Sequence, residues 1–253
     1  MKGSQKHLLD LVASPDRERH LNGLLDGTGF RVGHSLQPYG RDSMDARSEN
    51  AIETFLSRHS VTYAGDPADE LSPQWWKPYG GKGPTIDLLA LLAGGERAGL
   101  LVVEAKAHHG EMKQGDKKRP PKPQPKRIAN DLSIRLRLCE QSCVLSRLGF
   151  GEFTLSADRH YQLSNRLAYA SKLAECGLDV VLMYLGFTHS DIDRKKAFES
   201  GEEWDALVRQ HLDDIGSATI LGERLDIGRG TLQVLVRSLD PLGLGASEGG
   251  QHG

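Results

Sequence analysis

The sequence predicts an α/β fold in which helices flank one mixed β-sheet, and three observations support this. Two largely apolar runs, 85–92 and 100–106, are joined by the glycine-rich segment 93–99, a pattern typical of a β-hairpin. A further run, 180–185, is apolar without alternation, as in a parallel strand that is buried on both faces. Segments with helical patterns lie before and between these runs, which indicates an α/β arrangement.

The N-terminal part of the chain predicts short helices followed by less regular structure. Residues 7–25 carry two helical patterns, and Ser14 followed by Pro15 is a typical start of the second helix. Residues 28–40 predict an extended or looped stretch, because glycines recur through it. Residues 42–59 predict a helix with an apolar stripe along one side.

The C-terminal part predicts helices that alternate with strands. Residues 127–148 and 162–176 have helical patterns and precede the apolar strand, and residues 202–212 predict one more helix after it. The weak alternation over 231–236 favours a last strand. Residues 242–253 are rich in glycine, so we expect no fixed structure there.

These patterns divide the chain into three parts. We expect an N-terminal helical extension over 1–40, a single α/β domain over 41–240 and a disordered glycine-rich tail over 241–253. With 253 residues the chain is long enough to bury a substantial core.

Positive charge is concentrated in one segment, although the whole chain has a net charge of only -2. Residues 113–137 hold nine Lys or Arg residues against two acidic ones, and prolines interrupt the segment. Such a segment is typical of a flexible loop, but its clustered charge also favours a polyanionic partner. The candidate phosphate contacts in it are Lys113, Lys117, Lys118, Arg119, Lys122, Lys126 and Arg127.

The sequence favours a cytoplasmic protein without a membrane partner. The start of the chain has no secretory signal pattern, since charged residues interrupt its apolar positions at once. Its three cysteines lack the close spacing of a zinc site or a disulfide framework. The longest apolar runs are far too short to cross a bilayer.

Three charged residues lie in the two strands of the predicted hairpin, where buried strands should carry none. Asp87 lies in the first strand, and Glu104 and Lys106 project from one face of the second, because side chains alternate along a strand. Two carboxylates, with the backbone carbonyl of Ala105 as a third ligand, suit Mg²⁺, which prefers oxygen and keeps several waters. Lys106 would orient a water molecule and stabilise negative charge. This combination can hydrolyse a phosphodiester.

The order Asp87, then Glu104-Ala105-Lys106 after a hairpin-length gap, resembles the PD-(D/E)xK nuclease superfamily with its restriction-endonuclease-like core. In that family the aspartate begins the second core strand and the E-x-K lies on the third. Here Ile86 replaces the proline, and the resemblance spans roughly residues 42–187. It implies a Mg²⁺-dependent nuclease, with Mn²⁺ as a substitute, and it favours DNA over RNA. It also suggests a setting in restriction or phage defence, and a homodimer where both strands are cut.

The family adds a glutamate on the helix before the hairpin and polar residues on the helix after it. By that resemblance Glu49, which lies closer to the apolar stripe than Glu53, is the expected third acid, although a plain surface acid explains it equally well. Gln162 is the expected supporting residue on the later helix. The polar positions of that helix share one face at helical spacing, and Asn165 and Arg166 are candidate nucleic-acid contacts; the positions are Gln162, Asn165, Arg166 and Tyr169.

Other interpretations remain open. Asp87, Glu104 and Lys106 can form a salt-bridge ladder on an exposed sheet face, although the continuous Leu and Val around them favour burial. The chain can also be a nucleic-acid-binding or assembly subunit with a vestigial nuclease site. A third alternative is a metal-dependent hydrolase of another phosphate, for which the basic segment carries more charge than one phosphate needs.

Overall fold

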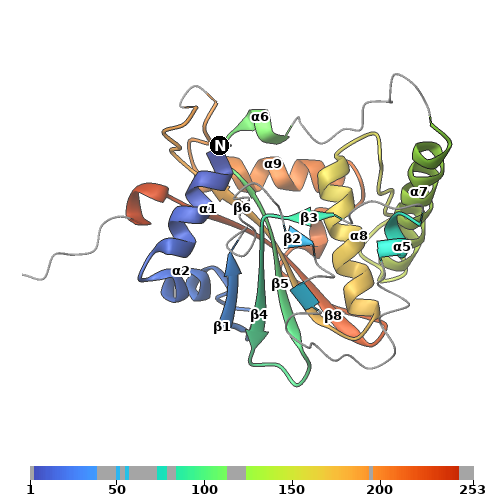
Figure 1. Ribbon diagram of the computed structural model, residues 1–253, viewed down its shortest axis with the longest axis horizontal. Helices are drawn as coiled ribbons and strands as arrows, with labels where there is room; N and C mark the ends of the chain where they lie inside the picture. The colour runs from blue at the N-terminus through green and yellow to red at the C-terminus, as the bar shows by residue number, and fades with distance from the viewer. Residues whose placement is uncertain are drawn as a thin grey trace, which may run out of the picture.

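The computed structural model describes most of the chain (Figure 1). The described residues are 3–38, 50–51, 55–56, 73–78, 84–112, 124–193 and 196–244.

A mixed six-stranded sheet forms the centre of the fold, in the order β1-β4-β5-β6-β8-β7. The strands β1, β4 and β5 pair antiparallel, whereas β5, β6 and β8 pair parallel and β7 returns antiparallel to β8. Their bounds are β1 Arg31–Pro38, β4 Leu88–Ala93, β5 Gly99–Lys106, β6 Asp179–Phe187, β7 Arg224–Ile227 and β8 Gly230–Leu239. The α/β fold with one mixed sheet flanked by helices is therefore confirmed.

Helices cover both faces of this sheet (Figure 1). The N-terminal helices α1 (Gly3–Ala13) and α2 (Arg17–Leu24) bury leucines in one core cluster with β4, β5 and β6. The helices α7 (Pro125–Ser146), α8 (Tyr161–Glu175) and α9 (Gly201–Asp213) bury theirs in the cluster on the opposite face. The three later helices agree with the segments that the sequence predicted. Within the described ranges, no helix combines the length and the apolar character that a bilayer crossing requires.

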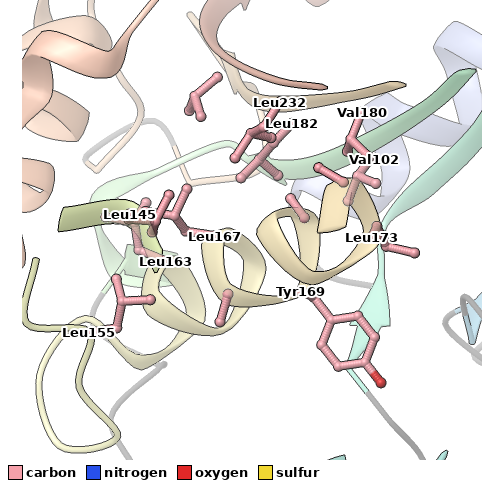
Figure 2. Close-up of a cluster of buried hydrophobic side chains, with 14 of the residues drawn as sticks. Val102, Leu145, Leu155, Leu163, Leu167, Tyr169, Leu173, Val180, Leu182 and Leu232 are labelled. Atoms are coloured by element: carbon pink, nitrogen blue, oxygen red, sulfur yellow. The ribbon is translucent and has the colours of Figure 1, made fainter. Parts of the chain in front are cut away.

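Side-chain alternation along β5 divides its residues between the two cores. Leu101, Val103 and Ala105 lie in the cluster with α1 and α2. Leu100 and Val102 lie in the cluster with α8, and Figure 2 shows Val102 near the leucines of that helix. Because side chains alternate, Glu104 and Lys106 continue the row that faces α8.

The local sequence explains where several of these elements start. Pro125 occupies the first turn of α7, where the missing N–H costs nothing. The Ser200 side chain caps α9 by accepting a hydrogen bond from the Glu203 backbone N–H at 3.2 Å. Strand β6 is buried along its whole length, and after Asp179 it is largely apolar, as the lack of alternation predicted.

A small second ladder differs from the sequence prediction. Strand β2 (Asn50–Ala51) pairs antiparallel with β3 (Thr85–Ile86), so the helix predicted over 42–59 is wrong at these two residues. Phe55 and Leu56 are helical and buried, and the rest of 42–59 lies outside the described residues. The pairing with β3 overrides the local helical pattern at Asn50 and Ala51, since short segments follow tertiary contacts more than propensity.

The structure also shows elements near the two ends of the chain that the sequence did not predict. The first forty residues, expected as a helical extension, supply α1, α2 and β1, and β1 pairs with β4 in the central sheet. Strand β7, which was not predicted, forms a hairpin with β8. At the C-terminal end Pro241–Leu244 form a 3₁₀ turn, and the remainder of the expected tail lies outside the described residues.

Candidate active site

Asp87 occupies a bend between β3 and β4, where the predicted continuous strand is interrupted. Its Oδ2 accepts a hydrogen bond from the backbone N–H of Ala105 at 2.8 Å, which joins the bend to β5. Burial and the nearby Glu104 carboxylate raise the pKa of Asp87 to about 7. Both effects disfavour the charged form of Asp87, so a cation bound beside it would stabilise the ionised carboxylate.

Glu104 and Lys106 lie on the same face of β5, as the alternation predicted, and both are buried. Lys106 Nζ is ion-paired with Glu104 Oε1, and Arg166 Nε donates to Glu104 Oε2 at 2.6 Å. Burial alone would raise the pKa of Glu104, but Arg166 and Lys106 together hold it below its usual value. The carboxylate is therefore ionised and clamped between two cations.

Lys106 remains a cation despite its burial. Burial by itself would lower its pKa, but Glu104 and Asp87 raise the pKa above the usual value. A lysine in this state donates hydrogen bonds and cannot accept a proton. A buried ionic cluster is costly in free energy unless each charge is compensated. A carboxylate whose pKa is strongly shifted beside such a cluster, as that of Asp87 is, marks a candidate functional site.

Arg166 and Asn165 project from α8 into the interior, where both are buried. Arg166 Nη1 donates to Asn165 Oδ1 at 3.2 Å, in addition to the ion pair with Glu104. The structure thus places these two candidate nucleic-acid contacts in the interior, where Arg166 pairs with Glu104 and Asn165 contacts Arg166. Tyr169 of the same predicted face packs edge-on against Trp75 and Trp76, with ring centroids 5.3 Å apart in both cases.

A small pocket opens beside Glu104 and Lys106. Its volume of about 20 Å³ exceeds the roughly 10–15 Å³ that one water molecule requires. Among the described residues it is lined by Glu104, Lys106, Met112, His160, Gln162, Leu163, Tyr184, Trp204 and His211. Gln162, the expected supporting residue, is thus brought to the site, whereas Asp87 is not part of this lining.

Strand β6 and helix α9 close one side of this pocket. Tyr184 is the register partner of Glu104 in the parallel pair, and its hydroxyl donates to the Leu163 carbonyl at 3.2 Å. The Trp204 indole Nε1–H donates to the Tyr184 carbonyl, also at 3.2 Å. Gly186 makes this approach feasible, since a Cβ there would lie 2.5 Å from the indole.

Two histidines on the pocket wall were not predicted from the sequence. His160 precedes α8, His211 lies in α9, and their rings stack with centroids 4.0 Å apart. His160 Nε2 is 2.8 Å from Asp214 Oδ2. No local motif connects these residues, because more than fifty positions separate His160 from Asp214.

Most of the predicted basic contacts and one predicted acid lie outside the described residues. Those positions are Glu49, Lys113, Lys117, Lys118, Arg119 and Lys122. Lys126 and Arg127 are described, and both are exposed in the first turn of α7. Their side chains are therefore accessible from solvent, and the predicted polyanionic partner stays a prediction.

The oxygen donors at the site are chemically suited to a hard divalent cation. Each oxygen of an ionised carboxylate can accept more than one hydrogen bond or cation, so the ion pairs of Glu104 leave acceptor capacity on it. Mg²⁺ keeps several waters and needs few protein ligands, and Asp87, Glu104 and the Ala105 carbonyl are hard oxygen donors. Over the described ranges, no group of three or more His, Cys, Asp or Glu side chains is arranged to hold a metal ion.

Comparison of the chain with protein-family models, curated proteins and solved structures gives no match in any of the three.

Proposed function

We propose that this chain is a metal-dependent nuclease that hydrolyses phosphodiester bonds, with DNA as the substrate favoured by its resemblance to the PD-(D/E)xK nucleases. The observation that carries the proposal is the cluster formed by the buried Glu104 and Lys106 and the partly buried Asp87 at the β4–β5 hairpin, in which Glu104 and Lys106 also line a pocket. Phosphodiester hydrolysis needs a positioned water, neutralisation of the phosphate charge and a stabilised leaving oxygen.

The strand order supports this proposal. Asp87 immediately precedes β4, the second strand of the order β1-β4-β5-β6, and Glu104 and Lys106 lie on β5, the third. In the nuclease superfamily that the sequence resembles, the aspartate begins the second core strand and the E-x-K lies on the third. The position of these charged residues on two adjacent strands therefore supports the proposal.

Each residue of the cluster has a role that follows from its surroundings. Lys106 is held cationic by Glu104, so it can donate a hydrogen bond to the attacking water and offset charge on the phosphate. Arg166 orients the Glu104 side chain through a hydrogen bond of 2.6 Å from Arg166 Nε to Glu104 Oε2. Asp87 and Glu104, with the Ala105 carbonyl, would hold Mg²⁺ or Mn²⁺, and the ion would act as a Lewis acid on the phosphate. Gln162 supplies a further polar group at the pocket.

The exposed basic residues favour a nucleic acid over a small phosphate ester. Lys126 and Arg127 are exposed where α7 begins, within the segment 113–137, which has a surplus of seven positive charges. Phosphate contacts of this type give affinity without sequence specificity. A role in restriction or phage defence, as a cytoplasmic enzyme and as a homodimer where both strands are cut, belongs to the same proposal and rests on the family resemblance alone.

A cleavage assay tests the proposal. Supercoiled plasmid, linear duplex DNA, single-stranded DNA and RNA are incubated with the purified protein in Mg²⁺, Mn²⁺ or EDTA. We expect metal-dependent cleavage that falls by about 100-fold or more in Lys106→Ala and Asp87→Ala, because each change removes a charge from the reacting centre. Lys196→Ala and Asp205→Ala remove exposed charges in ordinary surface ion pairs and should leave the rate unchanged.

A second function is favoured by one specific observation. Both oxygens of Glu104 are already bound by Lys106 and Arg166, as in a purely structural buried ion-pair triad. The chain would then be a nucleic-acid-binding or assembly subunit whose site no longer cleaves. In that case the protein retards nucleic acid in a gel shift, while no metal produces cleavage that Lys106→Ala abolishes.

A further inference from the structure

The pocket that Glu104 and Lys106 line is also lined by a histidine in an unusual backbone conformation. His160, the residue before α8, has φ 49° and ψ 42°, in the left-handed region that residues other than glycine seldom adopt. Its side chain makes no capping hydrogen bond to the helix. Such strained positions persist only where the surroundings impose them, and they concentrate at functional sites.

The surroundings of His160 hold its ring in one orientation. Nε2 contacts Asp214 Oδ2 at 2.8 Å, and the Arg159 guanidinium donates to the Asp214 backbone carbonyl. The His211 ring stacks on the imidazole at an interplanar angle of 27°. The hydrogen bond with His160 lowers the pKa of Asp214, so Asp214 is ionised and accepts a hydrogen bond from the Nε2–H of His160. Nδ1 is the ring nitrogen that does not contact Asp214, and His160 lines the pocket.

The charged groups around the pocket differ in their capacity to take a proton from water. Lys106 is held protonated by Glu104, and Glu104 is held ionised by two cations that occupy both of its oxygens. The Tyr184 hydroxyl donates to the Leu163 carbonyl, and burial raises its pKa. Among the described lining residues, this leaves the two stacked histidines, and His160 is held by the contact of its Nε2 with Asp214 Oδ2.

We infer that His160 is the general base that accepts a proton from the attacking water, with Asp214 as its positioning residue. This inference rests on the proposed nuclease function. The pocket supplies the geometry, since His160, Glu104 and Lys106 all line a volume large enough for one water. A base oriented by a third group is the usual arrangement for activating a nucleophile.

The step balances without any further reagent. The water oxygen forms a bond to phosphorus while Nδ1 of His160 takes one of its protons. The bond from phosphorus to the leaving oxygen breaks, and that oxygen keeps the electron pair and takes a proton from solvent. His160 then releases its proton to solvent, so the sum is a phosphodiester and water giving a phosphomonoester and an alcohol.

The chain contains a matched histidine outside the pocket. His189 has a φ of 52° and its Nδ1 lies 3.1 Å from Asp240 Oδ2, but its side chain is 54% exposed against 17% for His160. It therefore reproduces the backbone conformation and the aspartate partner of His160 without the pocket. Glycine suits the left-handed conformation at both positions, so both glycine variants should fold.

Chemical rescue of His160→Gly tests the inference. We expect its cleavage rate to fall by about 100-fold or more, the usual contribution of a general base. Added imidazoles should restore activity, and at equal free-base concentration the rescue should increase with the basicity of the imidazole. His160→Asn, which tolerates the same backbone conformation, should show the same loss, whereas His189→Gly should match the wild type and not respond to imidazole.

The outcomes separate this inference from the nuclease proposal. Cleavage by the wild type together with an unimpaired His160→Gly overturns the base and leaves the nuclease standing. An impaired variant that imidazoles do not rescue, or that the more acidic imidazoles rescue best, also overturns it. If the wild type cleaves no nucleic acid with any metal, the nuclease proposal fails and the inference fails with it.

Discussion

Glu104 on β5 and Arg166 on α8 form a buried ion pair, with Arg166 Nε 2.6 Å from Glu104 Oε2. The ion pair joins residues 62 positions apart and links the central sheet to the helix that covers it. Lys106 binds the other oxygen of the same carboxylate. The pair therefore positions the site and also contributes to the stability of the fold.

Removing Arg166 should destabilise the protein strongly. In Arg166→Gln the clamp has one cation fewer and Glu104 stays buried with less compensation, which typically costs about 3–5 kcal/mol. Urea denaturation monitored by circular dichroism measures the change. Arg135→Gln is the matched control, because Arg135 makes exposed ion pairs with Asp131 and Asp158 that should contribute at most about 1 kcal/mol. Equal losses of stability in the two variants would refute a buried, structural role for Arg166.

The raised pKa of Asp87 should make stability depend on pH. In the folded state this pKa is about 7, above the roughly 3.9 of an unfolded aspartate, so the folded protein binds more protons between these values. The contribution of Asp87 is complete below about pH 4 and is lost as the pH rises through 7. Glu104, whose pKa is lowered, acts in the opposite sense only as the pH falls below its ordinary range.

A comparison of wild type with Asp87→Asn isolates this effect. Between pH 5 and pH 8 the wild type should lose roughly 2–3 kcal/mol of unfolding free energy relative to the variant. Urea titrations at a series of pH values give the difference. Asp205→Asn, which removes an exposed carboxylate that pairs with Arg209, serves as the control. A constant difference between wild type and Asp87→Asn across this range would show that the Asp87 pKa is not raised.

Divalent cations should stabilise the folded protein in the same pH window. Their stabilising effect should increase with pH, whereas the contribution of Asp87 alone decreases. A cation at Asp87 and Glu104 competes with the proton on Asp87, so Mg²⁺ should raise the melting temperature more at pH 8 than at pH 5. The shift should disappear in Asp87→Asn and persist in Asp205→Asn. Differential scanning calorimetry with and without Mg²⁺ measures it, independently of any cleavage. A shift that Asp87→Asn retains would locate the cation elsewhere.

The local part of the site was predictable from the sequence because strand geometry determines it. Once 100–106 was identified as a strand, alternation required Glu104 and Lys106 to share a face, and the structure confirms this. The same reasoning could not predict the bend at Asp87. That bend depends on the hydrogen bond to Ala105 and on the pairing of β3 with β2, and both are tertiary interactions.

The rest of the site depends on interactions between distant segments. Helical spacing placed Gln162, Asn165 and Arg166 on one face but could not determine whether that face is exposed or buried. A buried arginine is stable only where a partner compensates its charge, and that partner, Glu104, lies on another element. The positive φ of His160 likewise has no glycine or asparagine to signal it in the sequence. Side-chain chemistry was therefore easier to predict than side-chain environment.

Gly186 should be intolerant of any side chain. A Cβ at this position would lie 2.5 Å from the Trp204 indole, which packs over β6 beside the pocket. Gly186→Ala should push the indole away, weaken its hydrogen bond to the Tyr184 carbonyl and cost about 1–3 kcal/mol. Gly23→Ala in α2 is the control, because nothing lies within 4 Å of a Cβ there and alanine favours a helix by about 1 kcal/mol. The melting temperature should thus fall in Gly186→Ala and rise in Gly23→Ala.

The exposed basic start of α7 should contribute to nucleic-acid affinity by binding phosphates. The double variant Lys126→Gln/Arg127→Gln removes two exposed cations. For each cation that neutralises a phosphate, its removal should reduce the slope of log K against log salt by about 0.9 on duplex DNA. Fluorescence anisotropy with a labelled duplex, from low to moderate salt, measures both affinity and slope.

The matched control for this double variant is Lys196→Gln/Arg209→Gln, which removes two cations from exposed surface ion pairs elsewhere. If net charge alone controlled binding, both double variants would lose affinity equally, since each changes the charge by the same amount. If α7 binds the nucleic-acid backbone, only the first variant changes the slope, because counterions are released only where a cation meets a phosphate. An unchanged slope in the first variant would remove Lys126 and Arg127 from the nucleic-acid interface.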